Sequence, residues 1–213
     1  MIPILQLESV AITTITFILT LVLTLFLTRS YLRGRKASSL FWSLGMWAFA
    51  IGVLLEILFA IGIYSEFLMA SYIFIVAILV ELLALGSIQL VNSRRIKLAY
   101  YAFCAASTAF MLYSVIVSRF ANLVVSYIVY GLPPLLTVYA SSFITFPAAA
   151  ILVIVALSGY LKGKSYRHLS IIAGVILVSI AGTLYIAAFP SMLYIAEFLG
   201  ILLLWVGFFR PKG

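Results

Sequence analysis

The stretch FLMASYIFIVAILVELLALGSIQLV, residues 67–91, contains one charged residue, Glu81, in an otherwise uncharged run. An α-helix rises about 1.5 Å per residue, so about 20 apolar residues cross a hydrocarbon layer about 30 Å thick. A helix over this stretch is therefore long enough to span a membrane. It would place a carboxyl group in lipid, where such a group is costly unless it is protonated or meets a hydrogen-bond donor. The fold and the surroundings of Glu81 are thus one question.

The rest of the chain has the same apolar character. Of its 213 residues, 66% are apolar and 8% are charged, which is too little polar surface for a soluble domain. We therefore expect an all-α integral membrane protein in which residues 1–213 form a single transmembrane domain. The apolar segments predict a seven-transmembrane helix bundle with helices at residues 9–28, 40–62, 67–91, 98–117, 139–161, 168–189 and 192–209.

The basic residues sort the predicted loops into two sides. With seven crossings, twelve of the 13 lysines and arginines fall on one side of the membrane, and Arg119 alone falls on the other. The twelve are Arg29, Arg33, Arg35, Lys36, Arg94, Arg95, Lys97, Lys162, Lys164, Arg167, Arg210 and Lys212. Because cytoplasmic loops carry an excess of Lys and Arg, we predict a multi-pass protein of the cell membrane with its amino terminus outside and its carboxyl terminus in the cytoplasm.

The basic side also predicts partners. Clustered Lys and Arg residues beside a membrane attract the anionic headgroups of lipids, and they offer a surface to which a cytoplasmic protein partner can dock. This distribution explains the net charge of +8 without nucleic acid.

One long connection remains, SRFANLVVSYIVYGLPPLLTV, residues 118–138. Two crossings over residues 120–161 would move the basic loop at 162–167 to the outside, so we predict an extracellular segment that lies against the bundle. Its β-branched and aromatic residues favour a short hairpin, and its Gly and Pro residues interrupt a helix. Long loops are often lids, although this one is as well explained as an interfacial segment that fills space. The candidate lid residues are Tyr127, Tyr130, Gly131, Pro133 and Pro134.

The sequence lacks the usual catalytic and metal-binding patterns. It contains no aspartate, one histidine and one cysteine. These counts leave no Ser-His-Asp arrangement, no His-rich metal cluster and no pair of axial histidines for a haem. We therefore expect no enzyme activity, no catalytic residues, no metal site and no cofactor. The single cysteine, Cys104, is interpreted as a small packing residue.

Three glutamates fall inside predicted helices. Glu56 shares a helix face with Gly45 and Gly52, and Glu81 shares one with Ala77 and Ala84. Faces of small residues are where helices approach one another, so both carboxyl groups are expected to point into the bundle. Most tyrosines, including Tyr72 and Tyr100, fall near predicted helix ends and are interpreted as aromatic belts.

The predicted depths of the three glutamates differ. Counted from the outer helix ends, Glu56 and Glu197 lie about 7–10 Å inside the membrane, whereas Glu81 lies about 20 Å inside. If the second and seventh helices are neighbours, Glu56 and Glu197, with Tyr194 one turn away, form a candidate site for a cation, an amine or a shared proton. Glu81 is then a deeper position that accepts a proton or a hydrogen bond. The alternative is that all three are protonated and only link helices.

Two segments resemble a known family. TRSYLRGRKASSLFWSLGMWAFAIGVLLEILFA, residues 28–60, has a basic turn and then Trp47 nine residues before Glu56, and VYGLPPLLTVYASSFITFPAAAILVIVAL covers residues 129–157. Together they resemble the seven-transmembrane N-terminal sensor region of prokaryotic histidine kinases. The resemblance implies an outside amino terminus and sensing of a ligand or of the membrane. The residues after the last predicted span, FFRPKG, contain no output domain, so a separate signalling partner is expected.

Three functional classes stay open at this point. The seven-helix pattern and the outer loop favour a sensor or receptor-like module that acts through a cytoplasmic or membrane partner. The intramembrane glutamates also fit a small proton-coupled or cation-coupled transporter. An accessory subunit of a larger membrane complex would need no internal site. The sequence does not identify a small ligand or ion for any of these classes.

Overall fold

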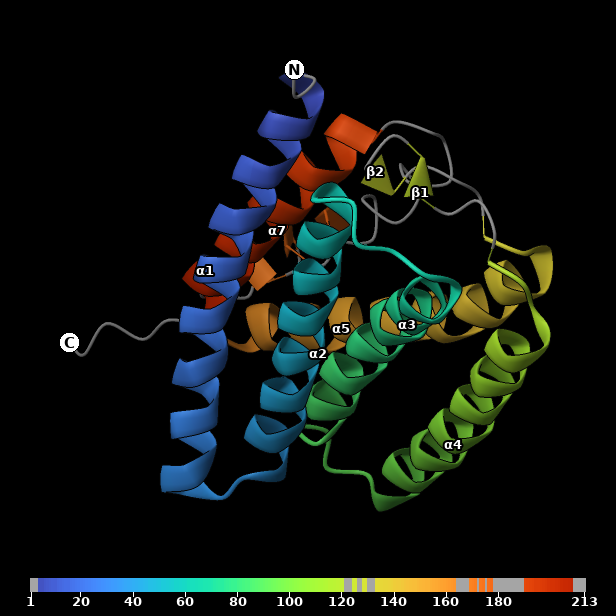
Figure 1. Ribbon diagram of the computed structural model, residues 1–213. Coiled ribbons are helices and arrows are strands. Elements are labelled where there is room, and N and C mark those ends of the chain that lie inside the picture. Colours follow the sequence, from blue (N-terminus) through green and yellow to red (C-terminus); the bar gives the residue numbers. More distant parts are fainter. Residues whose placement is uncertain are drawn as a thin grey trace.

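The computed structural model of the chain is a bundle of long helices (Figure 1). It describes residues 4–120, 124–125, 128–129, 133–163, 169–171, 173–174, 176–177 and 190–208, with side chains described from residue 10 onward and, in the last helix, from residue 195. In chain order the elements are α1 (Ile4–Gly34), α2 (Ala37–Ala60), α3 (Glu66–Ile88), α4 (Arg94–Val117), β1 (Val124–Val125), β2 (Ile128–Val129), α5 (Leu135–Gly163) and α7 (Pro190–Phe208).

Five of these helices, α1 to α5, are long and apolar enough to cross a membrane. The chain is therefore a multi-pass membrane protein. The first five predicted spans overlap these helices, and their ends differ from the helix ends by at most six residues. The last coincides with α7, whose described apolar stretch, Ile195–Gly207, is shorter. The predicted sixth span, 168–189, falls largely outside the described residues, so the count of seven stays a prediction.

Helix ends follow local chemistry. The Ser65 side chain accepts a hydrogen bond from the backbone N–H of Leu68 at 3.3 Å, which caps the first turn of α3. Ser93 caps α4 in the same way through the N–H of Ile96 at 3.4 Å. After α2 the chain turns at Gly62, whose φ of 90° a glycine adopts without strain.

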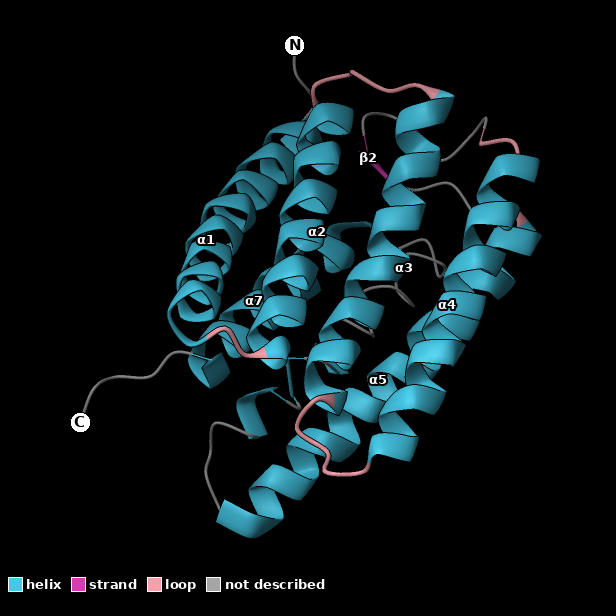
Figure 2. Ribbon diagram, turned by 90° about the horizontal axis from the view of Figure 1, so that it is seen from below, coloured by secondary structure: helices cyan, strands magenta, loops and turns pink. Residues whose placement is uncertain are grey.

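The helices pack in a simple order. α2 packs between α1 and α3, α4 and α5 both pack on α3 and on each other, and α7 packs on α1. Figures 1 and 2 both show α1 to α4 side by side, whereas in Figure 1 α5 crosses behind α2 and α3. With 29 residues, α5 is about 43 Å long at about 1.5 Å per residue.

The two ends of the bundle differ in charge. The end formed by the α1–α2 and α3–α4 connections, here called the basic end, carries most of the lysines and arginines that the structure describes. They are Arg29, Arg33, Arg35, Lys36, Arg94, Arg95 and Lys97. The opposite end, here called the hairpin end, holds the α2–α3 connection and the strands, and Arg119 lies there. This separation agrees with the predicted sorting of charge, while the side of the membrane that each end faces stays a prediction.

Close contact between α2 and α3 depends on glycines. A Cβ atom at Gly45 would lie 2.9 Å from Leu83 Cδ2, and one at Gly86 would collide with the indole ring of Trp42. The same interface buries Phe49 and Gly52. The small-residue faces therefore lie where helices approach one another, as predicted.

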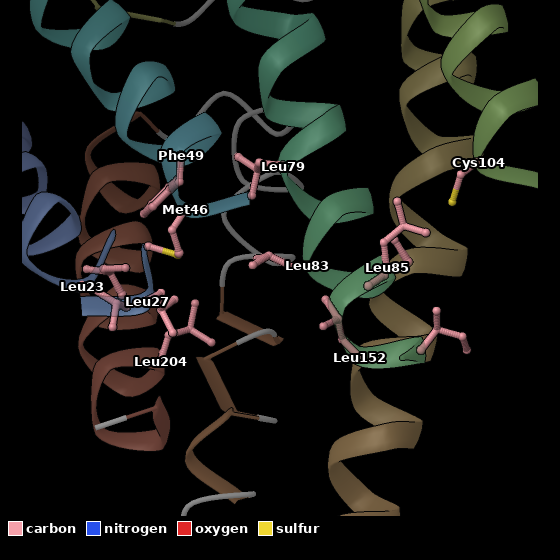
Figure 3. Packing of buried hydrophobic residues seen from close by; sticks show 14 of the residues in the cluster. Leu23, Leu27, Met46, Phe49, Leu79, Leu83, Leu85, Cys104, Leu152 and Leu204 are labelled. Carbon is pink, nitrogen blue, oxygen red and sulfur yellow. The ribbon is translucent and has the colours of Figure 1, made fainter. Parts of the chain in front are cut away.

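The main core lies between all the helices. Figure 3 shows Leu23 of α1, Met46 of α2 and Leu204 of α7 close together, with Leu83 of α3 nearby and Leu152 of α5 farther away. A second cluster near the hairpin end joins α2, α3, α4 and α5 and includes Phe59, Met111, Phe120, Ala140 and Ile144. The faces of α2 and α3 that carry Glu56 and Glu81 are buried together with these clusters.

The predicted hairpin in the long connection is confirmed. β1 and β2 pair antiparallel, with Val124 opposite Val129. The backbone N–H of the buried Phe120 donates to the Glu66 carboxylate at 3.0 Å, and this bond ties the segment to the start of α3. β2 also packs on α2.

The candidate lid residues are only partly described. Pro133 and Pro134 lie partly buried directly before α5, which begins at Leu135. Tyr127, Tyr130 and Gly131 lie outside the described residues, so a lid stays a prediction.

Candidate functional site: carboxyl groups inside the bundle

Glu56 lies on the buried face of α2, with 2% of its surface exposed. The Tyr72 hydroxyl of α3 donates a hydrogen bond to Glu56 Oε1 at 2.6 Å. The ring of Phe59, one turn along α2, packs edge-on against Tyr72 with centroids 5.7 Å apart and holds the phenol in place. Glu56 Oε2 is buried and has no hydrogen-bond partner among the described residues. Tyr72 therefore fixes one oxygen of this carboxyl group.

Glu197 of α7 supplies a second carboxyl group to the same place. The Glu197 side chain is partly buried, and its carboxyl group interacts electrostatically with that of Glu56. The structure thus brings together Glu56 and Glu197, the two glutamates that were predicted to lie at a similar depth in the membrane. The side chain of Tyr194 is not among the described ones, so its place in this site stays a prediction. We call Glu56 and Glu197 the carboxyl pair.

Helix α1 adds hydroxyl groups on its buried face. Thr24 donates to the backbone carbonyl of Met46 at 3.1 Å, and Thr28 Oγ1 and Ser43 Oγ lie 2.7 Å apart, which fixes the antiparallel register of α1 on α2. In this antiparallel register, Thr13 and Thr16 of α1 lie level with Glu56 of α2. Both are buried, so the helix that packs against α7 also presents hydroxyls at the depth of the carboxyl pair.

Glu81 lies between α3 and α4, with 3% of its surface exposed. The Ser107 hydroxyl lies 2.7 Å from Glu81 Oε1, and the Thr108 hydroxyl lies 2.7 Å from Oε2. Both oxygens of this carboxyl group are therefore hydrogen-bonded, and both partners come from α4. We call Glu81, Ser107 and Thr108 the Glu81 site.

Neither site contains a basic residue among those that the structure describes. The described lysines and arginines lie at helix ends, and none forms an ion pair with these carboxyl groups. Nor do three His, Cys, Asp or Glu side chains gather at one point within the described ranges. The carboxyl pair therefore offers a ligand two carboxyl groups and the Tyr72 hydroxyl. The Glu81 site offers one carboxyl group and two hydroxyls.

Sequence reasoning missed the specific partners. Tyr72 was interpreted as part of an aromatic belt, yet 4% of its surface is exposed and it donates to Glu56. Ser107 and Thr108 were assigned no role. A usable signal existed on α4, where Cys104, Ser107 and Ser114 repeat at helical spacing and are all buried. Such a polar face needs a partner on a neighbouring helix.

Comparison with known proteins identifies no relative. No protein family, curated protein or solved structure matches this chain.

Proposed function

We propose that the chain is a sensor-like membrane module whose carboxyl pair binds a proton or a small cation. The carboxyl groups of Glu56 and Glu197 meet inside the bundle, and Glu56 Oε2 has no hydrogen-bond partner among the described residues. This is the observation that carries the proposal. Two carboxylates so close together repel each other, so the pair is stable when the groups share a proton or hold a cation between them. Either occupant links α2 to α7.

The position of the carboxyl pair suits a response to the outside. We place the amino terminus and the hairpin end outside and the basic end in the cytoplasm, because Lys and Arg residues gather at the basic end. In this orientation the pair lies in the outer part of seven spans. Binding there would change the packing of α2, α3 and α7, whose other ends reach the cytoplasmic side. The resemblance to histidine kinase sensor regions likewise implies an outside amino terminus and sensing of a ligand or of the membrane.

A separate partner would receive the signal. The basic end offers Arg33, Arg35, Lys36, Arg94 and Arg95 as exposed charges, which suit anionic lipid headgroups and an acidic surface on a cytoplasmic protein. A partner that docks there would detect a shift of the α1–α2 or α3–α4 connection.

Proton-coupled transport is the second candidate, and the Glu81 site favours it. A carrier needs more than one protonatable position along its path, and Glu81 is a second intramembrane carboxyl group at a different depth from the pair. A sensor binds its ion without moving it across the membrane, whereas a carrier produces flux. Flux therefore separates the two candidates.

A stability measurement tests the binding proposal. The protein in lipid nanodiscs would be heated with added Na⁺, K⁺, Ca²⁺ or methylammonium, and at several pH values. A ligand that binds only the folded state at 100 times its Kd raises stability by about 2.7 kcal/mol, which shifts the Tm upward. We expect at least one of these conditions to raise the Tm of the natural protein and to have less effect on Glu197→Gln.

The control is Glu66→Gln, because Glu66 is exposed at the start of α3 and outside the pair. It should respond as the natural protein does. Equal responses from the natural protein and Glu197→Gln under every condition would refute binding at the pair. Vesicles loaded with a pH indicator then test transport, since a sensor is expected to give no proton flux above that of empty vesicles.

A further inference from the structure

Helix α4 turns a row of polar side chains toward α3. Tyr100, Cys104 and Ser107 have the spacing i, i+4, i+7, which puts them on one helix face. All three are buried, and Thr108 beside them is partly buried. Ser107 and Thr108 contact Glu81, whereas Cys104 and Tyr100 follow about one and two turns closer to the basic end. The row therefore leads from Glu81 toward the basic end.

The Glu81 site can hold its carboxyl group in two protonation states. Ser107 Oγ lies 2.7 Å from Glu81 Oε1, 2.8 Å from the Phe103 carbonyl and 3.1 Å from the Cys104 carbonyl. A hydroxyl has one proton to donate, so it serves one of these acceptors at a time. When Glu81 is ionised, Ser107 and Thr108 both donate to it. When Glu81 is protonated, its O–H donates to Ser107 Oγ and Ser107 donates to Phe103. Either pattern satisfies every group without a backbone movement.

Tyr100 provides the next group toward the basic end. Its side chain has 7% of its surface exposed, and its hydroxyl has no hydrogen bond to a described residue. It interacts electrostatically with the Cys104 thiol and the Glu81 carboxyl group. Tyr100 lies six residues after Arg94, the first residue of α4, which is about 9 Å along the helix axis. A phenol both donates and accepts hydrogen bonds, so it can pass a proton on.

The helices around this row add no competing charge among the described residues. In the core cluster that contains Tyr100 and Cys104, α2 contributes the buried Phe49 and Val53, and α5 contributes Ala148 and Leu152. All four are apolar. Among the described residues, the titratable groups that interact with Glu81 are Cys104 and Tyr100 of α4.

We propose that Glu81 is a proton-binding site that exchanges its proton with water at the basic end through Cys104 and Tyr100. This inference does not depend on the role of the carboxyl pair. The transfer conserves its proton. Because the Tyr100 hydroxyl is buried and has no hydrogen bond to a described residue, the transfer needs a water on each side of it. Glu81 releases a proton to a water beside Cys104, and that water passes a proton to the Tyr100 oxygen. The Tyr100 O–H then gives its own proton to a second water that connects to the basic end. The net change is one proton moved from Glu81 to water, and the reverse sequence reloads the site.

Infrared spectroscopy of the full chain in lipid vesicles tests this route. A protonated carboxyl group has a C=O absorption that shifts when its proton is replaced by deuterium. The absorption of Glu81 would be identified by its loss in Glu81→Gln and by its displacement in Thr108→Val, which removes one hydrogen bond to Oε2. The rate of the shift after transfer to deuterated water then measures proton exchange at this position.

The informative variant is Tyr100→Phe, with Tyr101→Phe as its matched control. Tyr101 is the next residue of the same helix, but it is exposed and accepts a hydrogen bond from Gln89 at 2.8 Å. A positioned proton-transfer group usually contributes about 10²–10⁴-fold to a rate. We expect Tyr100→Phe to slow exchange at Glu81 by at least about tenfold, because water replaces part of its role, and Tyr101→Phe to leave the rate unchanged. Equal rates in the two variants, or no protonated Glu81 absorption at any pH, would overturn the proposal.

A one-sided pH step tests the direction of the route. In sealed vesicles of uniform orientation, alkaline buffer on the basic side should remove the Glu81 absorption, and the same step on the hairpin side should leave it unchanged. A response to the hairpin side alone would contradict access from the basic end.

Discussion

The carboxyl pair and the Glu81 site place the same functional group in two different settings. Glu81 has both oxygens held by hydroxyls from one neighbouring helix. Glu56 has one oxygen held by Tyr72, and it faces a second carboxyl group on α7. The hydroxyls of the first arrangement can satisfy its carboxyl group in either protonation state. In the second, Glu56 Oε2 has no hydrogen-bond partner among the described residues. Equal burial therefore does not imply an equal role, because hydrogen-bond partners decide what a buried carboxyl group can still bind.

Both settings depend on α3, which carries Tyr72 and Glu81 nine residues apart. The largest effect is therefore expected where α3 packs on α2. Gly86→Ala would press a methyl group into the Trp42 ring, and overpacking of this kind usually costs about 1–3 kcal/mol. A lowered free energy of unfolding, measured by steric trapping or by chemical denaturation in mixed micelles, would confirm it.

The control for that experiment is Gly163→Ala, because a Cβ atom at Gly163 has no neighbour within 4 Å. It should leave stability unchanged. If both glycine variants unfold at the same denaturant concentration as the natural protein, the α2–α3 contact is looser than described.

An effect of similar size is expected at the Glu81 site. The double variant Ser107→Ala with Thr108→Val leaves both oxygens of a buried carboxyl group without these donors, and one unsatisfied buried group typically costs about 1–3 kcal/mol. Thr14→Val is a suitable control, because Thr14 is exposed and bonds only to its own helix at 2.6 Å. Unfolding midpoints in the same lipid would compare the two. A double variant as stable as the control would mean that Glu81 finds other partners.

Removal of Tyr72 should have a smaller effect. Tyr72→Phe deletes one hydrogen bond at 2.6 Å, and interhelical hydrogen bonds in membranes contribute about 0.6 kcal/mol on average, with values up to about 1.7 kcal/mol. Glu56 keeps the neighbouring Glu197 as a partner, which limits the loss. The same unfolding assay measures it. A loss larger than that of the Ser107 and Thr108 variant would reverse the comparison between the two sites.

The sequence predicted the framework better than the partners. Apolar length located the helices, and the i, i+4 spacing of Gly52 with Glu56, and of Ala77 with Glu81, correctly turned both glutamates inward. The valine-rich run after Phe120 predicted a hairpin, which the structure has. These features depend on local periodicity and propensity, which a single sequence contains.

The hydroxyl partners depend on something else. Whether Tyr72 reaches Glu56, or Ser107 reaches Glu81, is decided by which helices are neighbours and how each is rotated about its axis. The periodicity of apolar residues within one helix does not determine which helices are neighbours, nor how each is rotated against its neighbour. Tyr72 also lies near a helix end, where tyrosine is common for reasons unrelated to any site, so its position suggested an aromatic belt. The meeting of Glu56 and Glu197 was predictable only on the condition that α7 approaches α2.

The central claim is that Glu56 and Glu197 act as one unit while Glu81 is independent, and a pair of double-mutant cycles tests it most directly. The free energy of unfolding would be measured for Glu56→Gln, Glu197→Gln, Glu81→Gln and the two double variants that contain Glu56→Gln. We predict a coupling energy above about 0.5 kcal/mol between Glu56 and Glu197, and additivity within about 0.3–0.5 kcal/mol between Glu56 and Glu81. Additive effects of Glu56 and Glu197, measured in the same lipid, would contradict the claim.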